Sequence, residues 1–271
     1  HLRRAGAAGA VRRGAGYARA LPPHLTGDTF VVPALPVPSV AVRGTHARFP
    51  VHRIYCVGRN YAAHAREMGH DPDREPPFFF MKPADAIVLC PKGAGAPAEA
   101  PFPVATEDLH HEIEMVVALG KGGKDIPADK ALEHVYGYAV GIDLTRRDIQ
   151  AVAKKMGRPW DMAKGFDHSA PCGTILPAAK IGHPSKGRIQ ISVNGTVKQD
   201  ADIGDMIWNV PDTIAYLSTL VELFPGDLIY SGTPEGVAQV KRGEVMEGSV
   251  EGVGRIDPVN LRGQGHAVIR Q

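Results

Sequence analysis

Two glutamates interrupt an apolar stretch near the middle of the chain and limit how that stretch can fold. Glu112 and Glu114 stand two positions apart and are followed by Met-Val-Val-Ala-Leu. In a β-strand, side chains two positions apart point to the same face, so both carboxylates would share one side of a buried strand. Adjacent carboxylates repel each other unless a cation lies between them. The segment therefore predicts a strand that carries part of a metal site.

A third oxygen ligand is expected elsewhere, and Asp143 is the best candidate. It ends a second apolar segment, residues 137–143, at the point where a strand would leave its sheet. The same residue would also serve as the N-terminal cap of a helix predicted over residues 145–156, and taken alone this interpretation is favoured. Three carboxylates without a nearby thiolate favour a hard cation, Mg²⁺ or Mn²⁺ and also Ca²⁺, over Zn²⁺.

The patterning of the whole chain predicts a β-rich α+β fold with few helices. Short apolar segments alternate with Gly- and Pro-rich turns, without regular alternation of strands and helices. Besides the segment with the two glutamates, strands are expected at residues 52–57, 78–81, 137–143 and 228–230, and a hairpin at residues 189–197. Helices are expected at residues 60–68, 145–156 and 211–224. The short strand at 78–81 is expected to be buried.

We divide the chain into four parts by composition. They are a basic N-terminal extension (1–28), an extended Pro-rich lead-in (29–50), a catalytic domain (51–254) and a C-terminal tail (255–271). The extension has five arginines and no acidic residue before Asp28, as in mitochondrial transit peptides. It predicts location in the mitochondrial matrix, with the cytoplasm as the alternative. A tag remnant, or an arm that docks onto a partner, fits the same residues.

Composition argues against several functional classes. Lys and Arg total 31 against 29 for Asp and Glu, so we expect no nucleic-acid partner. No run of 18 apolar residues occurs, so no transmembrane segment is expected. The cysteines Cys56, Cys90 and Cys172 show no C-x-x-C spacing and fit neither a disulfide framework nor a zinc site. We expect them to be small buried side chains in a reducing compartment.

Two further groups have residue types that suit catalysis. His64 and Glu67 are three residues apart on a predicted helix, so the carboxylate could orient the imidazole as a general base. Lys164 lies between Trp160 and Phe166, which indicates partial burial of its amine. The alternative interpretations are a solvated surface pair for the first group and a surface lysine for the second.

Six motifs occur in an order that resembles the fumarylacetoacetate hydrolase family. They lie at residues 55–69, 76–83, 111–114, 141–148, 164–171 and 226–237. Within that family the chain is most similar to the small, single-domain acylpyruvate and fumarylpyruvate hydrolase branch. The resemblance implies a rolled mixed β-sheet, a homodimer, and an Mg²⁺ or Mn²⁺ ion held by Glu112, Glu114 and Asp143.

The resemblance also implies roles for other residues. Catalytic roles fall to His64, Glu67 and Lys164, and substrate-binding roles to Arg59, Arg147, Gln150 and Thr233.

The implied reaction is hydrolysis of a carbon–carbon bond in a 2,4-diketo acid, an acylpyruvate or fumarylpyruvate, to pyruvate and a carboxylic acid. Oxaloacetate decarboxylation and hydratase or isomerase reactions on 2-oxo acids are alternatives within the family. An alternative of another class is a structural or moonlighting subunit of a larger assembly, docked by residues 1–28 and 255–271.

Overall fold

A mixed sheet of eight strands supplies the two segments that carry the predicted metal ligands. The computed structural model describes residues 30–63, 75–90 and 97–262. The strand order is β4-β3-β15-β8-β9-β11-β5, with β12 paired to β9. The strands span Phe78–Lys82 (β4), Ile54–Gly58 (β3), Leu228–Tyr230 (β15), Ile113–Leu119 (β8), Val135–Ile142 (β9), Ala170–Gly173 (β11), Ile87–Cys90 (β5) and Leu176–Pro177 (β12). At the centre, β8 and β9 pair antiparallel, with Glu114 opposite Gly141.

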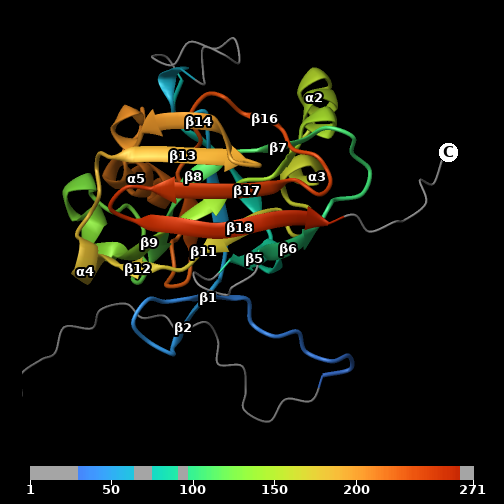
Figure 1. The fold of residues 1–271 in the computed structure, drawn as a ribbon. Coiled ribbons are helices and arrows are strands. Elements are labelled where there is room, and N and C mark those ends of the chain that lie inside the picture. Colours follow the sequence, from blue (N-terminus) through green and yellow to red (C-terminus); the bar gives the residue numbers. More distant parts are fainter. Residues whose placement is uncertain (1–29, 64–74, 91–96, 263–271) are drawn as a thin grey trace, which may run out of the picture. The chain divides into compact units, whose positions relative to one another are not determined.

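A second sheet of five strands has the order β14-β13-β17-β18-β6. Figure 1 shows β14, β13, β17 and β18 side by side in orange and red. These strands span Thr196–Asp202 (β14), Arg188–Val193 (β13), Val245–Val250 (β17), Gly254–Arg262 (β18) and Ala98–Pro101 (β6). The predicted hairpin is confirmed: Asn194 and Gly195 join β13 to β14, with φ of 49° and 77°, as a type I′ turn requires.

Smaller elements complete the described structure. A three-stranded sheet places β7 (Leu109–His111) between β10 (Thr145–Arg146) and β16 (Ala238–Gln239), and β1 (Ser39–Ala41) pairs with β2 (Arg48–Pro50). The helices are α2 (Arg147–Lys155), α3 (Asp161–Lys164), α4 (Ala178–Ile181) and α5 (Val210–Leu220), with 3₁₀ turns η1 (Ala84–Ala86), η2 (Ala128–His134) and η3 (Ile203–Asp205). The predominance of strands confirms the predicted β-rich α+β class. Among the described residues, no helix has the length and apolar character needed to cross a membrane.

Strand β8 is buried on both faces, which explains its nearly continuous apolar sequence. One face, with Ile113 and Met115, belongs to a core cluster that also contains Ile191 of β13 and Val259 of β18. Alternate residues such as Val116 face a second cluster with strands β3, β11 and β15. The three cysteines are free and buried, as predicted.

The structure corrects two predictions about the segment around Asp143. The helix predicted from Thr145 begins at Arg147, because Thr145 and Arg146 pair with β7 as strand β10. The N-cap residue of α2 is Arg146, without a side-chain capping bond, so the interpretation of Asp143 as the cap is wrong.

Two further predictions change at other positions. The strand at residues 78–81 is present as β4, but Met81 is 44% exposed, so the strand is not fully buried. Strand β18 runs to Arg262 and pairs with β17 and β6, so the sheet continues past the boundary expected at residue 254. The extension 1–28 and most of the helix predicted at 60–68 lie outside the described residues.

Candidate metal centre and substrate pocket

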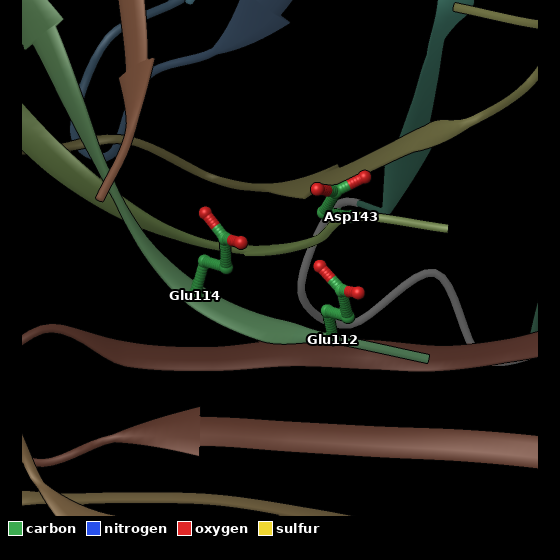
Figure 2. A group of neighbouring side chains, drawn as sticks. All are labelled: Glu112, Glu114 and Asp143. Atoms are coloured by element: carbon green, nitrogen blue, oxygen red, sulfur yellow. The ribbon is translucent and has the colours of Figure 1, made fainter. Parts of the chain in front are cut away.

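Three carboxylates meet at the ends of two neighbouring strands (Figure 2). Glu112 lies between β7 and β8, Glu114 is the second residue of β8, and Asp143 directly follows β9. One oxygen from each group lies within 4.8 Å of an oxygen of each of the other two. The backbone N–H of Asp143 donates to the carbonyl oxygen of Glu112 at 2.8 Å, which holds the two strand ends together. The structure thus brings the three predicted ligands into one buried cluster.

The surroundings of Glu114 oppose its ionisation. Burial, followed by the charges of Asp143 and Glu112, raises the pKa of Glu114 well above its ordinary value. Its Oε2 accepts a hydrogen bond from the N–H of Gly232 at 2.9 Å. A divalent cation would favour the ionised form of such a group, and three carboxylate donors fit a hard cation.

Two buried lysines balance the other two carboxylates. Lys164 Nζ lies 2.8 Å from Glu112 Oε2 and 2.7 Å from Asp143 Oδ2, and Lys82 Nζ lies 2.8 Å from Asp143 Oδ1. Burial alone would lower the pKa of Lys164, but the charges of Asp143 and Glu112 raise it above its ordinary value. Lys164 also donates to Thr145 Oγ1 at 2.6 Å, so it has a partner for each of its three donors. The surface interpretation of Lys164 is therefore wrong.

The first turn of α2 adds two polar groups to the cluster. Arg147 Nη2 lies 2.6 Å from Glu112 Oε1, and its Nη1 donates to Gln150 Oε1 at 2.6 Å. Because these residues are three apart on a helix, they share the face that points to the carboxylates.

A pocket with about 380 Å³ of empty space lies against this cluster. Its lining includes seven predicted site residues: Arg59, Glu112, Glu114, Arg147, Gln150, Lys164 and Thr233. The structure thus brings every described residue of the predicted substrate-binding set to one pocket. His64 and Glu67 lie outside the described residues, so their roles stay predictions.

Arg59 adopts a backbone conformation that is uncommon for a non-glycine residue. Its φ is 54°, in the left-handed region, where strain is frequently found at functional sites. Its guanidinium lies 4.7 Å from the ring centroid of Phe78, and its Nη1 lies 3.0 Å from Glu75 Oε2. The strained backbone holds this cationic side chain against an aromatic wall of the pocket.

Sequence reasoning missed two lysines of this region, Lys82 and Lys154. Lys82 follows an apolar strand and carries no local signal of its partner Asp143, which is 61 positions later. Lys154 stands seven positions after Arg147, a helical spacing that places both on one face of α2 and could have identified it. Its Nζ lies 5.1 Å from the ring centroid of Trp160, and burial and the charges of Arg147 and Arg59 lower its pKa to about 8.

Known proteins share both the sequence and the fold of this domain. Residues 53–258 match the family model described as fumarylacetoacetate (FAA) hydrolase C-terminal. The crystal structure of a fumarylpyruvate hydrolase from Pseudomonas aeruginosa, in complex with Mn²⁺ and pyruvate, is similar with a TM-score of 0.84 and 51% identity, covering 87% of this chain and all of that chain.

Two curated relatives carry other activities in their names. The mitochondrial oxaloacetate tautomerase of Arabidopsis thaliana is 39% identical over 75% of this chain and 88% of the relative. The mitochondrial oxaloacetate decarboxylase of Dictyostelium discoideum is 40% identical over 74% of this chain and 89% of the relative. The match to the family model covers most of the chain, and the fold agrees with it. This chain therefore belongs to the fumarylacetoacetate hydrolase family.

Proposed function

We propose that this protein is a divalent-metal-dependent enzyme that hydrolyses a carbon–carbon bond of a 2,4-diketo acid and releases pyruvate and a carboxylic acid. The observation that carries the proposal is the cluster of Glu112, Glu114 and Asp143 beside a pocket lined by cationic side chains. The similarity to a fumarylpyruvate hydrolase whose structure contains Mn²⁺ and pyruvate supports the same substrate class.

Glu112, Glu114 and Asp143 would hold the cation, and Mg²⁺ and Mn²⁺ suit their oxygen donors. When bound, the cation would supply Lewis acidity toward the oxygens of a 2-oxo acid. Lys82 and Lys164 place positive charge beside the carboxylates that they contact. Lys164 and Arg147 also place positive charge at the pocket wall, where it would stabilise the carboxylate of the substrate and the negative charge that develops during cleavage.

A second anionic group on the substrate would match Lys154. Arg59, Arg147 and Lys164 each lie within ion-pair distance of a glutamate, whereas Lys154 has no carboxylate at that distance among the described residues. A substrate with a distal carboxylate would supply this missing partner. The pocket therefore favours a dianionic substrate such as fumarylpyruvate over a monoanionic one such as acetylpyruvate.

We assign the general base to His64, oriented by Glu67, on the family motif alone. His64 would take a proton from a water that attacks the C4 carbonyl carbon. A C–O bond forms there, the C3–C4 bond breaks, and its electron pair passes to the pyruvate fragment as an enolate. Protonation at C3 then gives pyruvate, and the acyl half leaves as a carboxylic acid.

The relatives named for reactions of oxaloacetate support a second candidate function, the decarboxylation of oxaloacetate. Oxaloacetate is also a dianionic 2-oxo acid, and both named relatives are close to 40% identical to this chain. Decarboxylation of oxaloacetate needs no attacking water, so His64 would matter less to that reaction. The effect of removing His64 thus separates the two candidates.

Two further proposals concern the location of the enzyme in the cell and its oligomeric state. The mitochondrial relatives support the location predicted from residues 1–28, while a relative from the archaeon Pyrococcus abyssi supports the cytoplasmic alternative. Light scattering of the native protein tests the homodimer. Co-migration with a larger complex would instead favour the structural subunit docked by residues 1–28 and 255–271.

A substrate panel tests the proposed function directly. The purified full chain with Mg²⁺ is assayed against fumarylpyruvate, acetylpyruvate, fumarylacetoacetate and oxaloacetate, with substrate loss followed by absorbance. We expect the highest kcat/KM with fumarylpyruvate, and loss of activity after chelation. A clear preference for oxaloacetate would favour the second candidate, and inactivity on all four would contradict both.

Glu114→Gln should lose metal affinity without loss of the fold. We expect Mn²⁺ affinity to fall by about 100-fold or more, because a buried ligand is neutralised. The metal-free variant should be at least as stable as the metal-free wild type, since a repulsive charge has been removed. Calorimetric titration and thermal unfolding with and without Mn²⁺ measure both effects. The matched control is Glu247→Gln, an exposed position on β17 that loses the same charge. Equal Mn²⁺ affinity in the two variants would exclude the site.

His64→Ala should retain Mn²⁺ binding but lose turnover. A general base contributes roughly 100-fold or more to rate, so we expect kcat for fumarylpyruvate to fall by at least about that factor. Titration of Mn²⁺ and steady-state kinetics are run on the same preparation, with His46→Ala at an exposed position as the control. Near-normal turnover of fumarylpyruvate would remove His64 from the mechanism.

Lys154→Met should discriminate between substrates of different charge. Loss of one charge-assisted contact raises KM for fumarylpyruvate by about 10-fold or more, while KM for acetylpyruvate stays within about twofold. The control is Lys155→Met on the same helix, because Lys155 is exposed like Lys154 but does not line the pocket. An equal effect on both substrates would show that Lys154 does not bind a distal carboxylate of the substrate.

A further inference from the structure

Gln199 is a buried amide that connects the five-stranded sheet to strand β8 of the eight-stranded sheet. It also connects both of them to the loop at residues 231–234 beside the pocket. It lies in β14 and is 1% exposed. Its Oε1 accepts from the N–H of Ile113 at 3.1 Å and from His111 Nδ1 at 3.0 Å. Its Nε2 donates to Thr233 Oγ1 and to the carbonyl oxygen of Pro234, both at 2.8 Å. The amide thus uses its two donors and both lone pairs of its oxygen.

Two backbone groups fix the orientation of this amide. The N–H of Ile113 can only donate and the carbonyl of Pro234 can only accept, so oxygen must face the first and nitrogen the second. It follows that His111 carries its proton on Nδ1. Thr233 in turn donates its own proton to the carbonyl oxygen of Ile113 at 2.8 Å.

The loop that Gln199 holds runs along β8 beside the carboxylates. Ser231 donates from its N–H to the carbonyl oxygen of Met115 at 3.0 Å, and Gly232 donates to Glu114. Gly232 has a φ of 97°, and a Cβ there would come within 2.6 Å of Asn60 Cβ, so the loop depends on glycine at this position. Thr233 follows Gly232 in this loop and lines the pocket, whereas Gln199 does not line it.

We propose that Gln199 is a positioning residue, which anchors the loop at Thr233 and Pro234 against the pocket wall and thereby sets the affinity for the 2-oxo acid. Its position explains how a residue of the five-stranded sheet acts on a pocket that it does not line. The identity of the ligand rests on the proposed function, but the effect of Gln199 on the loop does not. A purely structural residue would lower stability without a specific effect on the loop or on ligand affinity.

A double-mutant cycle tests whether Gln199 acts through Thr233. Gln199→Met keeps the length of the side chain and removes all four hydrogen bonds, and Thr233→Val removes the hydroxyl. At saturating Mn²⁺, each single variant should weaken pyruvate binding by about 10-fold in calorimetric titration. The double variant should bind within about twofold of Thr233→Val, because both changes release the same loop. An additive loss of about 100-fold would overturn the proposal.

Amide hydrogen exchange of residues 231–236 without ligand gives a measurement that does not depend on the proposed function. We expect exchange in Gln199→Met to be about 10-fold faster or more, because the loop has lost its anchor. The control is Ser218→Ala, which removes a buried hydroxyl that accepts from the N–H of Ile126 at 2.8 Å in a region that does not line the pocket. This control should lower stability without changing loop exchange or pyruvate affinity.

Each failure points to a different conclusion. If wild-type protein with Mn²⁺ binds no pyruvate, the proposed function fails, and the exchange result still decides the role of Gln199. Unchanged exchange in Gln199→Met, or the same acceleration in Ser218→Ala, overturns the positioning role.

Discussion

The repulsion among three buried carboxylates is the constraint on which the rest of this site depends. An isolated buried carboxylate is costly, and three within 4.8 Å require compensation from their surroundings. Lys82, Lys164 and Arg147 supply it to Asp143 and Glu112. For Glu114, the described residues offer no lysine or arginine within ion-pair distance, and a backbone N–H is its recorded partner. A bound cation would supply to Glu114 the positive charge that the other two carboxylates receive from these side chains.

The fold holds these charges in place through strand pairing. Antiparallel pairing of β8 with β9 brings residue 114 next to residue 141 and leaves Asp143 at the strand end beside Glu112. The loop at residues 231–234 runs along the same strand, and Gln199 fastens it from the second sheet. A ligand site built on strand ends and a tightly bonded loop keeps its geometry better than one built on free loops. Because the paired strands are distant in sequence, the cationic residues of the pocket come from widely separated parts of the chain.

Local sequence patterns predicted the parts of the site that depend on local geometry. The two-residue period of a strand placed Glu112 and Glu114 together, and the aromatic neighbours of Lys164 indicated its burial. The choice between ligand and cap for Asp143 depended on whether Thr145 and Arg146 join a strand, which is decided by pairing with β7. A local pattern carries no information about such pairing.

Long-range partners set the limit of prediction at other positions. Lys82 and Gln199 meet partners that are distant in sequence, and nothing beside them in the chain identifies those partners. Strand β18 was missed because Pro258 interrupts its pattern, although its apolar residues Ile256, Val259 and Leu261 face the core. Its pairing with β17 and β6 outweighs that interruption.

The three-carboxylate metal site can be tested by a crystal structure of the protein grown with Mn²⁺ and pyruvate, with anomalous diffraction measured at the manganese edge. We expect one strong anomalous peak about 2.1 Å from an oxygen of each of Glu112, Glu114 and Asp143, with pyruvate in the adjacent pocket. No peak among these three carboxylates, or a peak held by other residues, would contradict it.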